Sequence, residues 1–504
     1  MLQHLPLLPV VIPLLTAIIM LFKPLNDYHT RLRILGTIVA IFMVIVSAYL
    51  LYSVHMDGTR IYALGGWQPP FGIALVADRL SSLMVLLTSI LTLATQLYGS
   101  SGEDKQGRFY HPLIMFQVMG IQGAFLTGDL FNLFVFFEVL LIASYALMIH
   151  GGGKQKTQAN LHYVSLNLAG SALFLFALGI LYGTFGTLNM ADMQQKAAHI
   201  ASNDIILAKT GGLLLLVVFG LKSAMLPLHF WLPKAYSSAP ISVAALFAIM
   251  TKVGLYSLWR VHNGVFGADA GELAYLIQPW LWPMAWLTLV IGIVATLSSQ
   301  SLRTLSANLV IVSVGSLLLM IALKTNLATT GGLYYLLHST LAGSAMFLVS
   351  GLIIEQRGKA EDRFVASRPM GQPALLSGLF FICAIALIGM PPLSGFIGKA
   401  FMLKAALEAD EVLMVWPPIL IASLASLIVL GRAGSTLFWR TKGDKPGPVT
   451  VQKRQLASVL VLFIALIAMV VWAGVLSDFL AMATLDLYGS ISIEHSSIFH
   501  GDAK

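Results

Sequence analysis

The chain has 504 residues, of which 58% are hydrophobic and only 10% are charged, with a formal net charge of +8. A soluble protein typically carries about 25% charged residues, so this composition excludes a soluble enzyme, a disordered chain and a nucleic-acid-binding protein. The single cysteine, Cys383, excludes an intramolecular disulfide bond.

Apolar runs, separated by charged or Gly/Pro-rich breaks, predict an all-α polytopic membrane protein with about fourteen membrane-spanning helices. We number them spans 1 to 14, at residues 2–22, 34–54, 77–99, 110–127, 130–149, 162–186, 210–230, 236–259, 274–299, 304–323, 331–354, 374–403, 413–438 and 456–480. The first run has no basic start and no small-residue cleavage site, so we expect a retained span rather than a signal peptide.

Lysine and arginine residues indicate the orientation of these spans in the bilayer. Of the 30 basic residues, 18 lie in the loops that follow odd-numbered spans and 8 lie on the other side. We therefore expect the odd-numbered loops to be cytoplasmic and both termini to face outward. Residues 484–504 are polar and are expected to form an exposed tail.

The four remaining basic residues, and one acid, fall inside the predicted spans. The basic ones are Lys222, Lys252, Lys399 and Arg432, and the only acid deep in a span is Glu138. A charge at the centre of a bilayer costs several kcal/mol on insertion scales, so such residues face the bundle interior or water and mark a proton or ion path. The alternative is a static Glu–Lys pair that fixes helix packing. Arginine stays charged, so Arg432 is interpreted as structural or field-setting.

Two of these lysines lie next to proline breaks. Lys222 precedes Pro227, and Lys399 follows Pro391 and Pro392. Proline removes a helical hydrogen bond, and a broken helix at membrane depth is tolerated only inside protein or beside water. Two interrupted spans, five spans apart and each with a lysine, predict an inverted repeat with ion sites at the broken helices. We expect the reversed order of lysine and proline to accompany that inversion.

Two further side chains have alternative interpretations. Lys252 has Tyr256 at i+4 and Trp259 at i+7, which favours either cation–π shielding or a relay step. His338 titrates near neutral pH and is either a relay group or a satisfied core histidine. In chain order the titratable groups form a row through which protons would hop along intervening water: Glu138, Lys222, Lys252, His338 and Lys399.

Three stretches of sequence carry a family resemblance. Residues 126–138 read LTGDLFNLFVFFE, residues 227–243 read PLHFWLPKAYSSAPISV and residues 390–396 read MPPLSGF. They resemble the antiporter-like membrane subunits of respiratory complex I. Within that superfamily the chain is most similar to the D-type subunits of the Mrp multisubunit sodium/proton antiporters, from span 3 to span 13.

This resemblance implies fourteen helices, two inverted five-helix repeats and discontinuous helices at spans 7 and 12. It divides the chain into residues 1–109 (spans 1–3), 110–260 (first repeat), 274–440 (second repeat) and 441–504 (a cytoplasmic loop, span 14 and an outward-facing tail). It places the family's essential acid on Glu138 and its essential lysine on Lys222, with relay positions at Lys252, His338 and Lys399. A lysine at position 399 favours the Mrp D-type or the complex I N-type over the M-type, which usually has glutamate there.

The function implied by the resemblance is proton translocation in a monovalent cation/proton antiporter of the cell (inner) membrane. Such a subunit is a secondary transporter component, not an enzyme. It exports cytoplasmic Na⁺ as H⁺ enters, works with A-, B-, C-, E-, F- and G-type partners in the lipid bilayer, and uses no cofactor and no assigned metal. One rival function is a proton-pumping membrane subunit of a redox complex such as complex I or a membrane-bound hydrogenase. Another is a structural scaffold with inert buried pairs.

Overall fold

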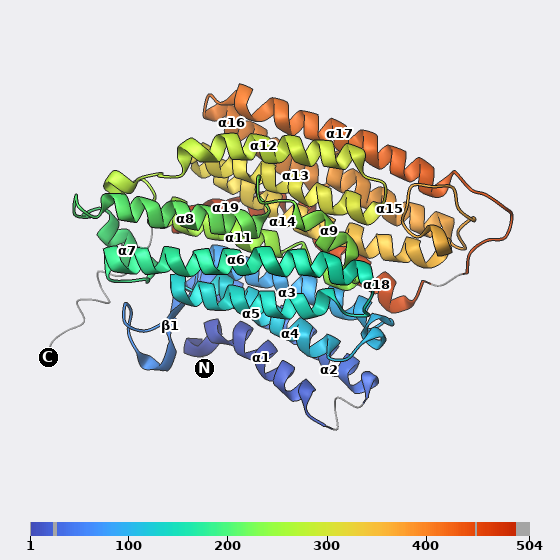
Figure 1. Cartoon of the computed structure of the whole chain (residues 1–504), viewed down its shortest axis with the longest axis horizontal. Helices are drawn as coiled ribbons and strands as arrows, with labels where there is room; N and C mark the ends of the chain where they lie inside the picture. Colours follow the sequence, from blue (N-terminus) through green and yellow to red (C-terminus); the bar gives the residue numbers. More distant parts are fainter. Residues whose placement is uncertain (1, 24–27, 449–450, 490–504) are drawn as a thin grey trace.

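The computed structural model describes residues 2–23, 28–448 and 451–489. Its long helices run side by side along the longest axis of the molecule (Figure 1), which confirms the predicted all-α polytopic fold. One short antiparallel hairpin within the described residues, β1 (Arg60–Ala63) with β2 (Ala74–Ala77), was not predicted.

The helices follow one another with short connections. Those of the first half are α1 (Leu8–Leu21), α2 (His29–Asp57), α3 (Arg79–Gly99), α4 (Tyr110–Leu126), α5 (Leu130–Met148), α6 (Lys154–Phe185), α7 (Met190–Ala197), α8 (Ile205–Ser223), α9 (Trp231–Ser238), α10 (Ile241–Phe247) and α11 (Met250–Leu258). Those of the second half are α12 (Gln278–Ser298), α13 (Leu302–Leu323), α14 (Asn326–Arg357), α15 (Pro373–Ile388), α16 (Ser394–Glu408), α17 (Val412–Phe438), α18 (Lys453–Val471) and α19 (Ala473–Gly489).

Twelve helical segments of the described chain are long and apolar enough to cross a membrane. Two predicted spans are not among the twelve. Span 4 folds as α4, which has 17 residues, and span 12 is divided into α15 and α16, with 16 and 15 residues. Every predicted apolar run is mainly helical, but length and hydropathy alone do not confirm the count of fourteen.

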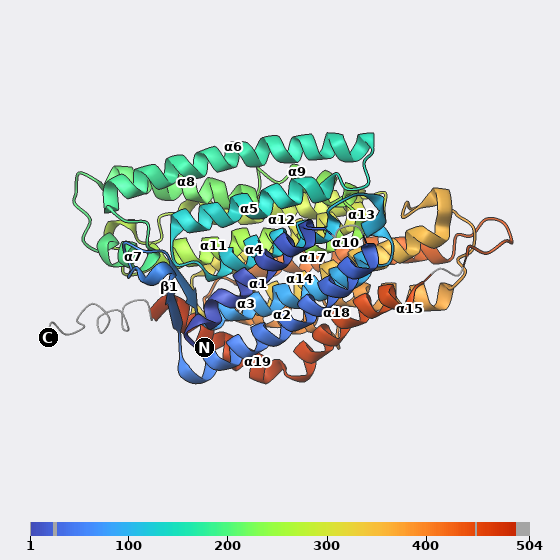
Figure 2. The same ribbon diagram turned by 90° about the horizontal axis from the view of Figure 1, so that it is seen from below.

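The odd-numbered loops meet at one end of the bundle, which we call the odd-loop end (residues 100–109, 149–153, 239–240, 299–301, 358–372 and 439–448). Contacts tie these loops together: the side chain of His150 binds the Glu103 carbonyl at 2.9 Å, and Ser301 pairs with Arg363 as an isolated bridge. The opposite, even-loop end carries the β1–β2 hairpin, α7, the start of the described chain and the end of α19 (Figure 2). The alternation of loops on which the orientation prediction depends is therefore present in the fold.

Both predicted helix breaks are observed. Helix 7 consists of α8 and α9, separated by residues 224–230, and helix 12 consists of α15 and α16, separated by residues 389–393. The predicted end of span 7 at residue 230 was wrong, because the helix resumes and continues to Ser238. Pro233 does not prevent this, since it is the third residue of α9 and the first amides of a helix have no intrahelical acceptor. The predicted start of span 8 at residue 236 was wrong for the same reason.

The two interrupted helices run in opposite directions. Helix 7 runs from the even-loop end to the odd-loop end and helix 12 runs back. Lys222 lies in α8 and Lys399 in α16, so both lysines occupy the half-helix nearer the even-loop end. The expectation that their reversed order reflects inversion was wrong. In an inverted repeat the corresponding helices keep the same order of residues but run in opposite directions. Inversion alone would therefore place one lysine nearer the even-loop end and the other nearer the odd-loop end.

Span 14 is longer than predicted. It bends at Trp472 between α18 and α19 and packs along α14 through side-chain hydrogen bonds, one of which joins Thr329 to Tyr488 at 2.7 Å. Others are Gln455 to Glu355 (2.7 Å), Tyr334 to the Met469 carbonyl (2.8 Å) and Thr330 to Thr484 (3.2 Å). Residues 484–489 are therefore helical, and the prediction of an exposed tail was wrong for them. Residues 490–504 lie outside the described residues.

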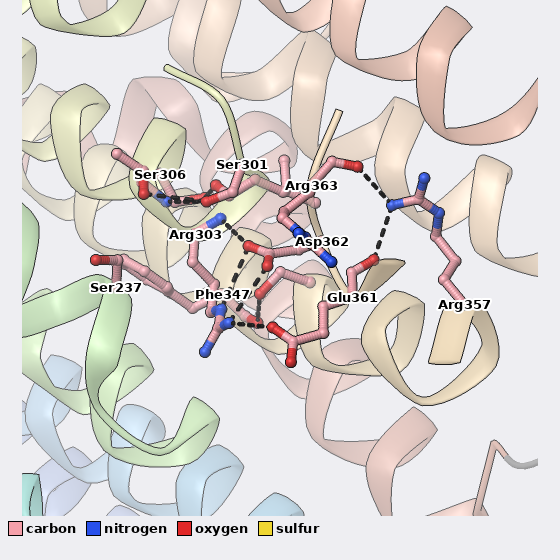
Figure 3. A network of polar contacts seen from close by, with 12 residues as sticks. Ser237, Ser301, Arg303, Ser306, Phe347, Arg357, Glu361, Asp362 and Arg363 are labelled. Atoms are coloured by element: carbon pink, nitrogen blue, oxygen red, sulfur yellow. Dashed lines mark hydrogen bonds and ion pairs between the residues drawn. The ribbon is translucent and has the colours of Figure 1, made fainter. Parts of the chain in front are cut away.

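An arginine network fixes the loop between α14 and α15 at the odd-loop end (Figure 3). The buried Arg357 donates hydrogen bonds to the carbonyls of Glu361 and Arg363, at 2.7 and 2.8 Å. The Asp362 carboxylate accepts the backbone N–H of Arg303 at 2.7 Å and also contacts its guanidinium. An acid at the first turn of α13 is favoured by the helix dipole, so this loop also stabilises the start of that helix.

Glu103, in the loop between α3 and α4, holds the start of α10. Its carboxylate accepts the backbone N–H groups of Ile241 at 2.8 Å and Ser242 at 3.1 Å, and also the Ser242 hydroxyl. These are charge-assisted bonds at a helix N-terminus. They connect the first three helices to the segment that carries Lys252.

We predict that Glu103→Ala lowers the free energy of unfolding by about 1–2 kcal/mol, as loss of a helix cap does. The measurement is thermal unfolding in detergent, followed with a thiol-reactive dye that reaches the buried Cys383 only on unfolding. Glu272→Ala is the control, because that side chain is 71% exposed and its contact with Lys209 is 3.9 Å long. Equal unfolding temperatures for the two variants would contradict the capping role.

Candidate functional site

The first cluster lies where α5, α6 and α8 meet. Glu138 of α5 is half-buried and accepts a hydrogen bond from Ser171 of α6. Lys222, in the last turn of α8, is 4% exposed and donates to the Asn167 side-chain oxygen at 3.3 Å. Asn167 and Ser171 are one turn apart on α6, so they share a face. The acid and the lysine interact electrostatically but form no direct ion pair within the described chain, and α6 provides the polar bridge between them.

Phe137 adds a second contact to Lys222. The lysine ammonium lies 5.7 Å from the centre of the Phe137 ring, a distance at which a cation is attracted to the ring face. The interruption of helix 7 begins two residues later, at Ala224 with φ of 59°. Lys222 is therefore buried beside the interrupted end of α8. Its contacts are an amide and an aromatic ring rather than a carboxylate.

Lys252, in α11, is 1% exposed and donates to the Ser313 hydroxyl of α13 at 2.6 Å. One predicted alternative for Lys252 was cation–π shielding by Tyr256, and among the described residues the structure has no such contact between these two side chains. The cation over the Tyr256 ring is Arg260, at 5.2 Å. A hydroxyl is thus the hydrogen-bond partner that the structure gives this buried ammonium.

His338 and Lys399 lie together at the break of helix 12. The His338 Nδ1 is 2.9 Å from the Ser394 hydroxyl, in the first turn of α16. Lys399 donates to the Ile388 carbonyl at 2.8 Å and to the Ser423 hydroxyl at 2.7 Å. Because α15 ends at Ile388, that carbonyl has no helical donor, and the lysine satisfies it.

A small internal cavity connects the second cluster. Its volume is about 20 Å³, which is enough for one water molecule. Ser313, His338 and Lys399 all contribute to its lining. One water molecule in this cavity would therefore face Ser313, which is the partner of Lys252, and also His338 and Lys399.

The two clusters approach each other at α8 and α11. A side chain at Gly254 would come within 2.8 Å of the Ser223 backbone nitrogen, so only glycine lets these two helices pack this closely. Within the described chain no hydrogen bond or ion pair joins Lys222 to Lys252. The five predicted residues thus form two groups, Glu138 with Lys222 and Lys252 with His338 and Lys399.

Sequence reasoning missed the neutral partners of these groups, which are Asn167, Ser171, Ser313, Ser394 and Ser423. Among them, only Ser394 lies in a stretch that carries the family resemblance. Arg432 is apart from both clusters: it donates to the carbonyls of Leu297 and Ser299 at the end of α12. In the part of the chain that the structure describes, no group of three or more His, Cys, Asp or Glu residues could hold a metal ion.

Comparison with known proteins assigns this arrangement to a family. The model of the family described as "NADH:quinone oxidoreductase/Mrp antiporter, TM" matches residues 127–428, which include all five charged groups. The chain belongs to this family. Within it, the chain is 37% identical to the D subunit of a probable K⁺/H⁺ antiporter of Rhizobium meliloti (strain 1021), over 97% of both proteins. It is 38% identical to the D subunit of the Na⁺/H⁺ antiporter of Bacillus subtilis (strain 168), over 88% of both.

A solved structure supports the same assignment. A chain in the structure of the Mrp complex from Dietzia sp. DQ12-45-1b superposes with a TM-score of 0.85 and 26% identity, over 98% of both chains. This antiporter-family protein is therefore similar to the D subunits in sequence and to an Mrp-complex chain in fold, over almost its full length.

We predict that Asn167→Leu destabilises this protein by about 1.5–3 kcal/mol, because it leaves the buried Lys222 ammonium without its acceptor. Adding Lys222→Met removes the charge that needs the acceptor, so the double variant should recover most of the loss. Thermal unfolding of the single and double variants, each purified in the same detergent, measures both effects. Additive losses in the double variant would show that the two side chains are not coupled.

Proposed function

We propose that this subunit conducts protons through a multisubunit monovalent cation/proton antiporter that exports cytoplasmic Na⁺ as H⁺ enters. The observation that carries the proposal is the row of buried titratable side chains, each held by a neutral hydroxyl, amide or carbonyl. A buried charge without a fixed counter-ion is expensive to keep. Static packing gives no reason for three buried lysines, a buried histidine and a half-buried glutamate in one bundle, whereas a proton path does.

The roles proposed for the five residues follow from their partners. Glu138 and Lys222 act as a switch: when the Glu138 carboxylate takes up a proton, its attraction for the Lys222 ammonium is lost. Lys222 then releases its proton toward Lys252, and the amine takes up another when the carboxylate ionises again. Lys252, His338 and Lys399 pass the proton on. Serine hydroxyls support such a relay because they both accept and donate hydrogen bonds.

We also propose that the subunit acts with A-, B-, C-, E-, F- and G-type partners and binds no redox cofactor of its own. Its first and second repeats are residues 110–260 and 274–440. The half-buried position of Glu138 supports a partner contact, since an ionisable side chain is unfavourable at a lipid-facing surface. The two relatives differ in the cation they are named for, so Na⁺ and K⁺ are both to be tested.

The main rival function is a proton-pumping subunit of a redox complex. It predicts no response of a pH gradient to added cations. The scaffold alternative predicts that neutralising Lys222 lowers assembly but leaves transport per assembled complex unchanged. One assay separates all three.

We predict that Lys222→Ala lowers cation-induced collapse of a pH gradient by about tenfold or more, the scale at which proton-transfer groups contribute to rates. The measurement uses everted vesicles from cells that express the whole complex, energised and then given Na⁺, K⁺ or Li⁺, at matched complex levels. Lys404→Ala is the control, because that lysine is 63% exposed. No response of the wild type to any cation would favour the redox pump. An unimpaired Lys222→Ala complex would favour the scaffold.

The proposed orientation has the even-loop end, with both termini, outside the cell. We predict that, in a Cys383→Ala background, Ser202→Cys is labelled on intact cells by a membrane-impermeant thiol reagent and Asp444→Cys is labelled only after permeabilisation. Both side chains are exposed: Ser202 lies in the even-numbered loop between α7 and α8, and Asp444 in the odd-numbered loop between α17 and α18. The reverse labelling pattern would overturn the orientation without affecting the fold.

A further inference from the structure

A cavity of about 80 Å³, lined by both apolar and polar side chains, lies at the even-loop end, apart from the two clusters. The β1–β2 hairpin forms one wall through Ile61 and Val76, and the start of α7 forms another through Asn189 and Ala191. The hairpin and α7 lie side by side at this end of the bundle (Figure 2). A volume of this size holds several water molecules, and its lining has polar groups to bind them.

The inner wall of the cavity carries ionised side chains. Arg260 forms a close ion pair with Asp78, the residue that caps α3, and Arg79 pairs with Asp486 at 2.7 Å. Asp78, Arg260 and Asp486 all line the cavity. Ionised pairs that are only partly shielded from solvent are tolerated inside a membrane bundle where water reaches them.

Tyr256 stands between this cavity and the relay. It lines the cavity, and its hydroxyl donates to the Phe125 carbonyl at 2.6 Å while accepting the Arg260 Nε–H at 2.9 Å. Arg260 is the second residue of the π-helical stretch Trp259–Val265. Such stretches are frequent at functional sites. Lys252, Tyr256 and Arg260 are spaced four residues apart, so they share one face of the helix that leads from the cavity to Lys252.

We propose that this cavity is the outer water vestibule of the subunit, and that Tyr256 passes protons from it to Lys252. The proposal rests on the proposed antiport function and adds the site at which protons enter. A hydronium ion in the cavity gives a proton to the phenolic oxygen of Tyr256 as the phenol, turning its O–H away from the Phe125 carbonyl, gives its own proton to the neutral Lys252 amine. The products are water, the unchanged phenol and the Lys252 ammonium. The Arg260–Asp78 pair positions the phenol, and Asp486, which pairs with Arg79, is the other charged side chain that lines the cavity.

The test uses Ala191→Cys in the complete complex, with Cys383→Ala as the background. Ala191 contributes only a methyl group to the cavity, so its variant can be compared before and after labelling. A positively charged, membrane-impermeant thiol reagent is applied from the outer side. We expect labelling of Ala191→Cys to reduce antiport about tenfold or more relative to the same unlabelled complex. Ser202→Cys, exposed at the same end but outside the cavity, should be labelled without a change in antiport.

Labelling of Ala191→Cys that leaves antiport unchanged would overturn the vestibule while the antiport function stands. Reaction only from the cytoplasmic side, or no reaction from either side, would also overturn it. Absence of antiport in the background complex would overturn the proposed function instead, and the vestibule with it.

As a second variant, Tyr256→Phe keeps the ring that packs edge-on against Phe125 at 5.0 Å and removes only the hydroxyl. Antiport should fall about tenfold at matched complex levels, and unchanged antiport would exclude Tyr256 from the path.

Discussion

The burial of ammonium groups without carboxylate partners is the constraint on which the rest of this structure depends. An isolated charge in an apolar interior is unfavourable by many kcal/mol. Lys222, Lys252 and Lys399 are nevertheless 9% exposed or less, and each donates to an uncharged oxygen. A direct carboxylate partner would stabilise the charged form strongly and hold the proton in place. A hydroxyl, amide or carbonyl oxygen compensates less for the lost hydration of the ammonium group. The charged and neutral forms of the lysine therefore lie closer in free energy. Proton exchange within the bundle requires that balance.

The interrupted helices supply some of the oxygens that this arrangement needs. In a continuous helix every carbonyl before the last turn already has a donor, whereas a break inside the bundle frees several. Lys399 takes one such carbonyl, from Ile388, and Lys222 lies in the last turn before the other break. Lys399 therefore lies beside the prolines where the broken helix supplies an acceptor, whereas Lys222 takes its acceptor, Asn167, from α6.

The sequence predicted the charged members of the site and missed the neutral ones. Glu138 and the three lysines were identifiable because a charge is rare within an apolar span, and the breaks were identifiable because proline and glycine interrupt helices. Ser171, Asn167, Ser313 and Ser423 gave no such signal, since small polar residues occur throughout these spans and only the packing of α6, α13 and α17 brings them to the charges. The path of helix 7 beyond residue 230 was missed because a proline near the start of a new helix looks in sequence like the end of an old one. The relay roles themselves stay a prediction.

The division of the row into two groups has a mechanical consequence. Glu138 and Lys222 lie in the proposed first repeat, whereas the partners of Lys252 lie on α13 and around the helix 12 break, in the proposed second repeat. Lys252 is itself on α11, whose Gly254 packs against the backbone at the end of α8. A small movement of α11 together with α13 against α8 would thus change the separation of the two groups and keep the Lys252–Ser313 hydrogen bond. Because packed interfaces switch between discrete arrangements rather than deforming continuously, this contact is where the proposed relay would couple the state of the Glu138–Lys222 pair to Lys252, His338 and Lys399.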